Sequence, residues 1–400
     1  MTQMPPSPSL ESVDLALDEL PGQALHDVLR AYRERGPVQP ARFLGLPAFA
    51  ITGHRELLQA FKDVDRFPPH RMYQVAFEGA IGKTFISMES PEQHRVYRKL
   101  ATPAFRSRAV ASYEREGLEA LAHELIDGLA ERDEFDLMAD FVAPLPYLVI
   151  TRLLGLPRER EEAFHGWALA LLRFRDDPVA AAKAAGELTD FLAPVVEARR
   201  REPRNDVISE LVAAEVGGRR LSDEEVYSHV RLLFPTGGET THGSLGNLLY
   251  ALFHHEGLWD ALCRDPGAAA GAVEEALRWE TPIAVLPRLS SRDAVEFGGV
   301  EIPPDSWVLF AIAAANRDPA VFPDPDRFDV RRFATDTLTF GRGVKSCPGM
   351  HLARKTMNVA LRSLLERVPG LELLDPEAAR PRRATLRCPE ALRVARRRNR

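Results

Sequence analysis

A short glycine-rich stretch near the C-terminus constrains this chain more than any other feature. Residues 340–349 read Phe-Gly-Arg-Gly-Val-Lys-Ser-Cys-Pro-Gly, and a helical pattern follows over 350–365. Glycines let such a loop turn tightly and let a flat ligand approach the backbone. With Pro348 at the first helical position, the helix N-terminus would favour an anionic sulfur, so Cys347 can be held as a thiolate. A buried structural cysteine is the alternative interpretation for this residue taken alone.

The composition is that of an ordinary globular protein. The chain has 400 residues, 45% of them hydrophobic and 28% charged, and its net charge is −6, which disfavours nucleic acid as a partner. No linker-like stretch divides it, so we expect one domain over 1–400, with a flexible N-terminus over 1–20 and a frayed basic tail over 393–400. The sequence shows neither a signal peptide nor an apolar run long enough for a membrane helix. Its 3 cysteines lack framework spacing, which indicates a reducing, cytoplasmic setting.

Helical patterns dominate the chain and predict a mainly α fold with small β-sheets. A capping box at Ser222 opens a long helix that we expect to run to about His254. Shorter helices are predicted over residues 25–36, 54–62, 91 onward and 268–279, a hairpin over 39–51, and short β-segments over 285–308. The stretch 67–87 has no regular pattern, and loops of that length are often functional.

The long helix contains residues that ordinarily disrupt helices. Pro235 removes a helix hydrogen bond, and the glycines that follow cost roughly 1 kcal/mol each against alanine. Beside them, Glu239 and Thr240 form an acid–alcohol pair that can deliver protons to a reduced oxygen species. The alternative is a plain break between two shorter helices, with Glu239 solvated.

Two further pairs lie at helical spacing. Glu275 and Arg278 are at i, i+3 and share one helix face, where such a pair is usually a weak surface contact. His94 and Arg98 are at i, i+4 and can point the same way. Taken singly, each of these residues is most simply a surface charge.

Together these segments resemble the cytochrome P450 family over essentially the whole chain. The loop matches the family's haem-binding signature, Phe-Gly-x-Gly-x-[His/Arg]-x-Cys-x-Gly, at Phe340, Gly341, Gly343, Cys347 and Gly349. The long helix matches the [Ala/Gly]-Gly-x-[Asp/Glu]-Thr motif at Gly237, Glu239 and Thr240. Lys345 and Thr236 depart from the two motifs, although Lys345 keeps the positive charge.

The resemblance implies a single cytochrome P450 fold with haem b between the long central helix and the helix after Cys347. It implies that Cys347 ligates the iron and that Glu239 and Thr240 relay protons. The expected cofactor-binding residues are His94, Arg98, Arg288, Phe340, Gly341, Lys345, Cys347 and Gly349. The family's structural ion-pair network should comprise Glu275, Arg278 and Arg327. The candidate substrate-pocket residues are Met72, Phe77, Phe85, Trp167, Leu233, Thr236, Ile283, Val285 and Leu386.

The activity implied is insertion of one oxygen atom from O₂ into a hydrophobic small molecule. We expect a monomer without a membrane anchor or a fused reductase, so that electrons come from a separate ferredoxin and ferredoxin reductase. The basic residues expected to face an acidic ferredoxin are Arg95, Lys99, Arg106, Arg108, Arg342, Lys345 and Arg354. A haem-thiolate protein that does not oxygenate, such as a ligand carrier, a sensor or an isomerase, is the alternative.

Overall fold

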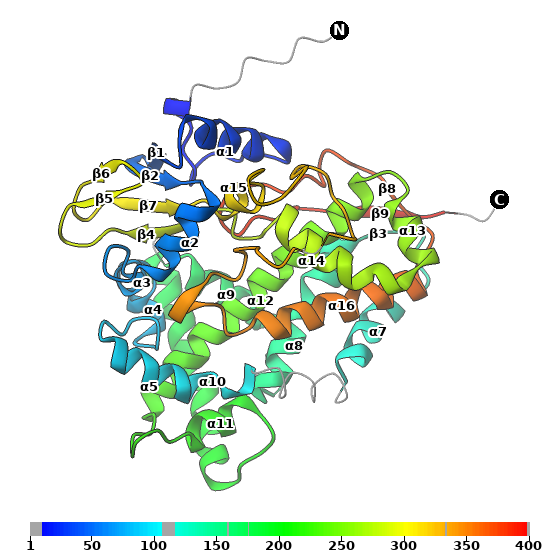
Figure 1. Ribbon diagram of the computed structural model, residues 1–400. Helices are drawn as coiled ribbons and strands as arrows, with labels where there is room; N and C mark the ends of the chain where they lie inside the picture. The colour runs from blue at the N-terminus through cyan, green and yellow to red at the C-terminus, as the bar shows by residue number, and fades with distance from the viewer. Residues whose placement is uncertain (1–9, 106–116, 158–159, 175, 333, 398–400) are drawn as a thin grey trace.

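The helix α12 (Asp223–His254) runs through the centre of the molecule, as the computed structural model shows (Figure 1). The structure describes residues 10–105, 117–157, 160–174, 176–332 and 334–397. The predicted capping box is confirmed, because the Ser222 hydroxyl accepts the Glu225 N–H at 3.2 Å and the Glu225 carboxylate accepts the Ser222 N–H at 2.9 Å. The helix continues without a break through Pro235, so the alternative of two shorter helices is wrong.

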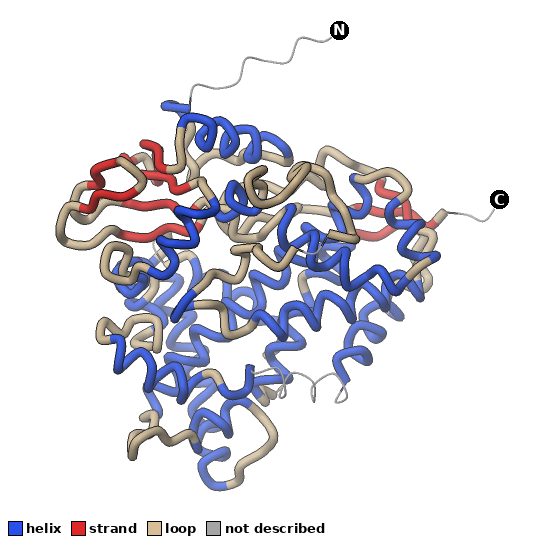
Figure 2. The backbone as a smooth tube through the Cα atoms, viewed as in Figure 1, coloured by secondary structure: helices blue, strands red, loops and turns tan. Residues whose placement is uncertain are grey.

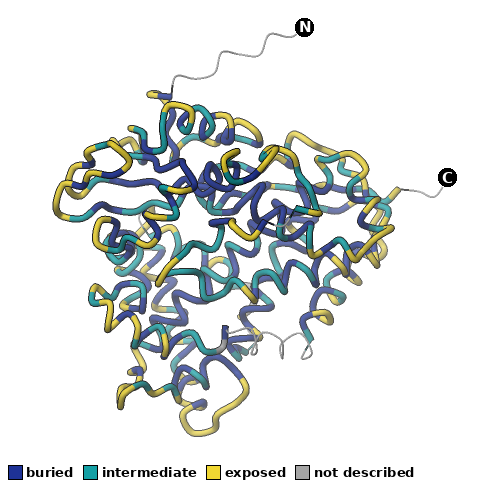
Figure 3. Tube along the Cα trace, viewed as in Figure 1, coloured by how far each residue is buried: buried dark blue, intermediate teal, exposed yellow. Residues whose placement is uncertain are grey.

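Helices surround α12 and bury it. Its principal neighbours are α8 (Pro144–Leu154), α9 (Glu161–Leu172), α10 (Pro178–Arg201), α14 (Ala269–Trp279) and α16 (Met350–Arg367). The other α-helices of the described residues are α1 (Gln23–Arg35), α2 (His54–Lys62), α3 (Pro69–Ala76), α4 (Glu78–Ile81), α5 (Pro91–Ala101), α7 (Glu119–Asp127), α11 (Val207–Ala213), α13 (Leu258–Arg264) and α15 (Ile312–Asn316). Figure 3 shows buried positions concentrated along the central helices and exposed positions on the outer turns.

Small sheets lie on two sides of the helical body (Figure 2). The larger has the order β1-β2-β7-β4, formed by β1 (Val38–Phe43), β2 (Leu46–Ile51), β7 (Trp307–Phe310) and β4 (Leu286–Leu289). Only β2 and β7 pair in parallel in it. The second sheet has the order β3-β9-β8, formed by β3 (Glu134–Asp136), β9 (Arg393–Arg396) and β8 (Leu371–Leu373), and a hairpin joins β5 (Val295–Phe297) to β6 (Val300–Ile302). The predicted mainly α fold with small sheets is confirmed.

Three local predictions are wrong. The stretch 67–87 is not irregular, because α3 and α4 occupy most of it. Residues 10–20 are packed, since Leu15 is fully buried and its N–H donates to the Arg42 carbonyl at 3.1 Å. The start of the basic tail is not frayed, because it forms β9 between two other strands. Residues 1–9 and 398–400, and the expected basic residues Arg106 and Arg108, lie outside the described ranges.

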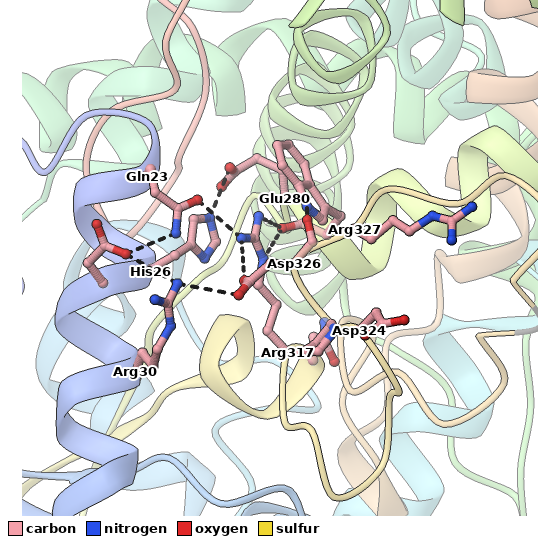
Figure 4. Close-up of polar contacts among 12 residues, drawn as sticks. Gln23, His26, Arg30, Glu280, Arg317, Asp324, Asp326 and Arg327 are labelled. Carbon is pink, nitrogen blue, oxygen red and sulfur yellow. Dashed lines mark hydrogen bonds and ion pairs between the residues drawn. The ribbon is translucent and has the colours of Figure 1, made fainter. Parts of the chain in front are cut away.

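A buried ionic cluster ties α1 to the helical body (Figure 4). Glu280, at the end of α14, accepts hydrogen bonds from Arg387 at 2.6 Å and bonds to His26 of α1 at 3.0 Å. Burial alone would raise the pKa of the Glu280 carboxyl, but the charge of Arg387 and the hydrogen bond to His26 outweigh it, so this pKa lies well below its ordinary value. Burial also lowers the pKa of His26 to about 4, so this side chain is neutral at physiological pH.

Over the described residues, no helix combines the length and the apolar character needed to cross a bilayer.

Candidate functional site

The Cys347 sulfur lies at the N-terminus of α16. The loop before it folds back, since the Cys347 N–H donates to the Phe340 carbonyl at 2.8 Å and Gly341 takes a φ of 64° that favours glycine. Burial raises the pKa of the Cys347 thiol, whereas the N–H of Gly349 and the charge of Arg98 lower it. Helix α16 begins at Met350, so Pro348 precedes the helix and the prediction that it takes the first helical position is wrong.

Four basic side chains near this sulfur have no acidic partner. In the described part of the chain, none of His94, Arg98, Arg288 and Lys345 forms an ion pair. Burial and the charges of Arg288 and Arg98 lower the pKa of Lys345 to about 7. Burial lowers the pKa of Arg288 to about 10, and that of His94 to about 4 with help from Lys345 and Arg98. Cations that crowd together in this way favour a bound anion.

Two of these side chains also carry unsatisfied polar atoms. The Nε2 atom of His94 and the Nη1 atom of Arg98 are buried and find no hydrogen-bond partner among the described residues. The other Arg98 nitrogen, Nη2, donates to the Ser346 carbonyl at 2.5 Å, and Lys345 Nζ lies 3.2 Å from the Ile86 carbonyl. Because orphaned buried donors are rare in folded proteins, these two atoms indicate a missing acceptor. A cavity of about 700 Å³ is lined by His94, Arg98 and Lys345.

The acid–alcohol pair lies at the middle of α12. The Thr240 hydroxyl donates to the Thr236 carbonyl at 2.7 Å, and the Thr236 hydroxyl donates to Leu232 at 2.6 Å. The Glu239 side chain is 9% exposed and accepts the Tyr147 hydroxyl at 2.7 Å, so it is not the solvated residue of the alternative interpretation.

The ion-pair network contains a residue that the sequence did not identify. Glu275 and Arg278 are fully buried and form two hydrogen bonds, at 2.7 and 2.8 Å, so they are not a surface pair. The predicted third member is wrong, because the Arg327 side chain is 70% exposed and contributes only its carbonyl, which accepts Arg278 at 3.2 Å. Figure 4 shows the Arg327 side chain extending away from Glu280 and Arg317. Arg332 takes its place, with Nε 3.1 Å from a Glu275 oxygen.

The predicted pocket residues divide between core and partly exposed positions. Met72, Phe85, Trp167, Leu233 and Val285 are buried, and Phe77, Thr236, Ile283 and Leu386 are partly exposed. Trp167 packs between Phe164 and Phe191, and its ring N–H donates to Glu187 at 2.8 Å, which are the contacts of a core residue between α9 and α10.

Three further side chains beside Glu239 were missed. Tyr147 lies on α8, His165 on α9 and His242 on α12. His242 could have been found, because it stands at i+3 from Glu239 on one helix face. Tyr147 is separated from Glu239 by 92 positions along the sequence, and a pattern of neighbouring residues cannot predict a contact over that separation.

Known proteins resemble this chain over nearly its whole length. A family model described as "Cytochrome P450" matches residues 269–369. The chain is 36% identical to 6-deoxyerythronolide B hydroxylase of Saccharopolyspora erythraea, over 89% of this chain and 92% of that protein. It is 35% identical to cyclomarin C epoxidase CymV of Salinispora arenicola, over 88% and 91%. The solved structure of the ligand-free P450 monooxygenase TamI superposes with a TM-score of 0.84 at 35% identity, covering 96% of this chain and 94% of that one.

The fold and the cysteine loop thus define a haem-thiolate oxygenase. The chain belongs to the cytochrome P450 family, and it is a bacterial-type P450 monooxygenase. The residues present fit the family's cofactor, because an anionic group with two carboxylates would satisfy both the unpaired cations and the orphaned donors of His94 and Arg98. A metal ion at Cys347 would deprotonate the thiol that burial keeps neutral.

Proposed function

We propose that this protein binds haem b and oxidises a hydrophobic small molecule with electrons from a separate ferredoxin and its reductase. Cys347 would ligate the iron in this proposal. His94, Arg98, Arg288 and Lys345 would hold the propionates, while Phe340, Gly341 and Gly349 shape the loop around the sulfur. When bound, the haem would supply an iron centre that activates O₂, and a thiolate ligand would favour O–O cleavage.

One observation carries the assignment of the cofactor site. Arg98, Arg288 and Lys345 come from three separate segments, yet none of them forms an ion pair with a carboxylate of the described residues. Such an arrangement is unfavourable in the absence of an anion, because burial and then the charges of Arg288 and Arg98 disfavour the charged form of Lys345 and lower its pKa. A dianionic cofactor removes this repulsion, and it explains why lysine can replace the family's usual His or Arg at this position.

In the same proposal, Glu239 and Thr240 move protons toward the reacting oxygen. The Thr240 hydroxyl donates a hydrogen bond to the Thr236 carbonyl, so its oxygen lone pairs are available to accept a hydrogen bond from another donor. Glu239 is buried next to it on the same helix turn, where a carboxylate can take up one proton and pass it on. A hydroxyl and an acid at this spacing form a two-step path.

The relatives support a hydrophobic substrate. One is named as a hydroxylase of 6-deoxyerythronolide B and another as an epoxidase of cyclomarin C, and a TamI structure is described as tirandamycin C-bound. The partly exposed candidates Phe77, Ile283 and Leu386 are apolar, as small-molecule sites mostly are.

We infer the docking surface for the ferredoxin from the positions of basic side chains that have no acidic partner among the described residues. Arg95 and Lys99 line the cavity at the α5 side, whereas Arg354 is already paired with Glu274 at 2.6 Å. We therefore narrow the expected docking surface to Arg95, Lys99 and Arg342, where positive charge would steer an acidic ferredoxin. Charge reversal at Lys99 should slow ferredoxin-driven reduction and weaken its salt dependence, whereas reversal at Arg354 should act mainly through the loss of its partner.

The optical spectrum of the reduced protein with carbon monoxide tests the cofactor assignment. A strongly red-shifted Soret band is expected for the wild type, and the Cys347→His variant should lose it while still binding haem. A wild-type band at the position of neutral ligation would refute thiolate ligation by Cys347. Titration of the ferric protein with terpenes, steroids, fatty acids and aromatics should then identify the substrate class through a low-to-high-spin shift.

A further inference from the structure

A buried carboxylate, a tyrosine and two imidazoles meet where three helices pack together. Glu239 Oε2 accepts the Tyr147 hydroxyl at 2.7 Å and lies 3.8 Å from His165 Nε2. Its other oxygen, Oε1, lies 3.6 Å from His242 Nδ1. The His165 ring is 5.0 Å from the Tyr147 ring and 6.4 Å from the His242 ring, measured between centroids. The four side chains therefore form one contiguous group.

This group extends from the interior to the surface. The Glu239 and His242 side chains are 9% and 12% exposed, whereas that of His165 is 44% exposed. A single imidazole thus separates the buried carboxylate from bulk solvent. Gly238 makes this packing possible, because a Cβ atom there would lie 2.5 Å from the Tyr147 ring.

The polar atoms of this group surround the Glu239 carboxylate. His242 Nδ1 is buried and has no hydrogen-bond partner within the described ranges, and Glu239 Oε1 lies 3.6 Å from it. Burial raises the pKa of the Tyr147 hydroxyl and the Glu239 charge raises it further, so Tyr147 keeps its proton and acts as a fixed donor. Cys388 is the other titratable group that senses Glu239, and burial raises its thiol pKa to about 11.

The protonation state of Glu239 shows why this carboxylate needs a nearby proton donor. Burial raises the pKa of this carboxyl, but His242, Tyr147 and His165 together bring it below its ordinary value. Glu239 is therefore ionised at neutral pH and must receive a proton each time it gives one. Burial lowers the pKa of His165, which makes its imidazolium a readier donor.

We propose that His165 is the solvent-facing proton donor that reprotonates Glu239. In this proposal His242 is a second imidazole on the proton path to Glu239, and Tyr147 is a positioning residue. The inference rests on the proposed function, in which Glu239 passes protons to Thr240. In the step itself, the N–H bond at His165 Nε2 breaks and an O–H bond forms at Glu239 Oε2. The neutral imidazole then takes a proton from solvent, and no electrons are transferred. The 3.8 Å separation requires a rotation of the ring or one bridging water.

Proton uptake by Glu239 can be measured apart from oxygenation. In the ferric holoprotein, a rapid drop in pH should produce the infrared carboxyl band of Glu239, which is assigned by its absence in Glu239→Gln. His165→Gln should slow the appearance of this band by about tenfold or more, as expected for loss of a positioned general acid. His165→Arg keeps a positive charge, but a guanidinium group does not release its proton in the pH range of this experiment. The infrared band should therefore appear as slowly in this variant as in His165→Gln.

Three results would overturn the proposal. A wild-type rate in His165→Gln would show that protons enter elsewhere. A wild-type rate in His165→Arg would show that only the charge matters. The same slowing in His123→Gln, a control on α7, would show that any lost histidine has this effect. In turnover, His165→Gln should divert a larger fraction of electrons to peroxide. If the wild type oxygenates no substrate, the proposed function fails, while the infrared rates still decide the role of His165.

Discussion

Replacing Arg332 with alanine should cost the folded protein about 3 kcal/mol, whereas the same change at Arg327 should cost almost nothing. The Arg332 side chain is 14% exposed and donates to Glu275 at 3.1 Å and to the Pro323 and Asp324 carbonyls at 2.6 and 3.1 Å. A hydrogen bond to a buried charge contributes roughly 1.5–3 kcal/mol, and the carbonyl bonds add a smaller amount. Within the described residues, the Arg327 side chain has a single ion pair, to Asp329 at 3.9 Å, and it is exposed.

The two variants form a matched pair, because both remove an arginine from the segment that joins α15 to the cysteine loop. Urea unfolding of the purified proteins should show a lower midpoint for Arg332→Ala, and its haem content after expression should fall. Arg327→Ala should match the wild type in both measurements. Glu275→Ala should be more severe, by about 3–5 kcal/mol, because it leaves the fully buried Arg278 without a counter-charge.

The reasoning would be refuted if Arg332→Ala unfolded at the wild-type midpoint with full haem content. It would also fail if Arg327→Ala were as damaging as Arg332→Ala, since that result would mean that the segment, and not the buried contact to Glu275, sets the stability.

Three further predictions follow from other parts of the molecule. Ser222→Ala removes the cap of α12 and should destabilise the protein by about 1 kcal/mol in the same unfolding assay, whereas Ser222→Asp should restore it. Between pH 6.5 and pH 4 the unfolded chain protonates His26 while the folded chain does not, so the stability should decrease as the pH decreases, by up to about 3 kcal/mol from this residue alone. His26→Gln should flatten the dependence of stability on pH, and an unchanged dependence would contradict the assignment. Lys345→Met should stabilise the haem-free protein by roughly 1–2 kcal/mol, because it removes a charge that burial and repulsion from Arg288 and Arg98 disfavour, yet it should weaken haem retention. Lower stability in both states would argue against an anion site.

Much of the fold is encoded in signals that are local along the chain. The capping box at Ser222 identified the start of α12 to the residue, because the cap depends only on neighbouring backbone groups. The hairpin of β1 and β2 and the extent of α2 were also recognisable from short-range patterns. The stretch 67–87 was misjudged because α3 and α4 are short helices, and short helices are stabilised by packing more than by propensity.

By itself, the sequence determined the elements of the reactive centre. The glycine loop with Cys347, the pair Glu239–Thr240 and the pair Glu275–Arg278 are each contained within a few residues, so their spacing is written in the chain. The tertiary structure alone decided which distant groups complete them. Arg332 rather than Arg327 reaches Glu275, and Tyr147 and His165 converge on Glu239, because contacts between helices depend on how faces pack and not on proximity along the chain.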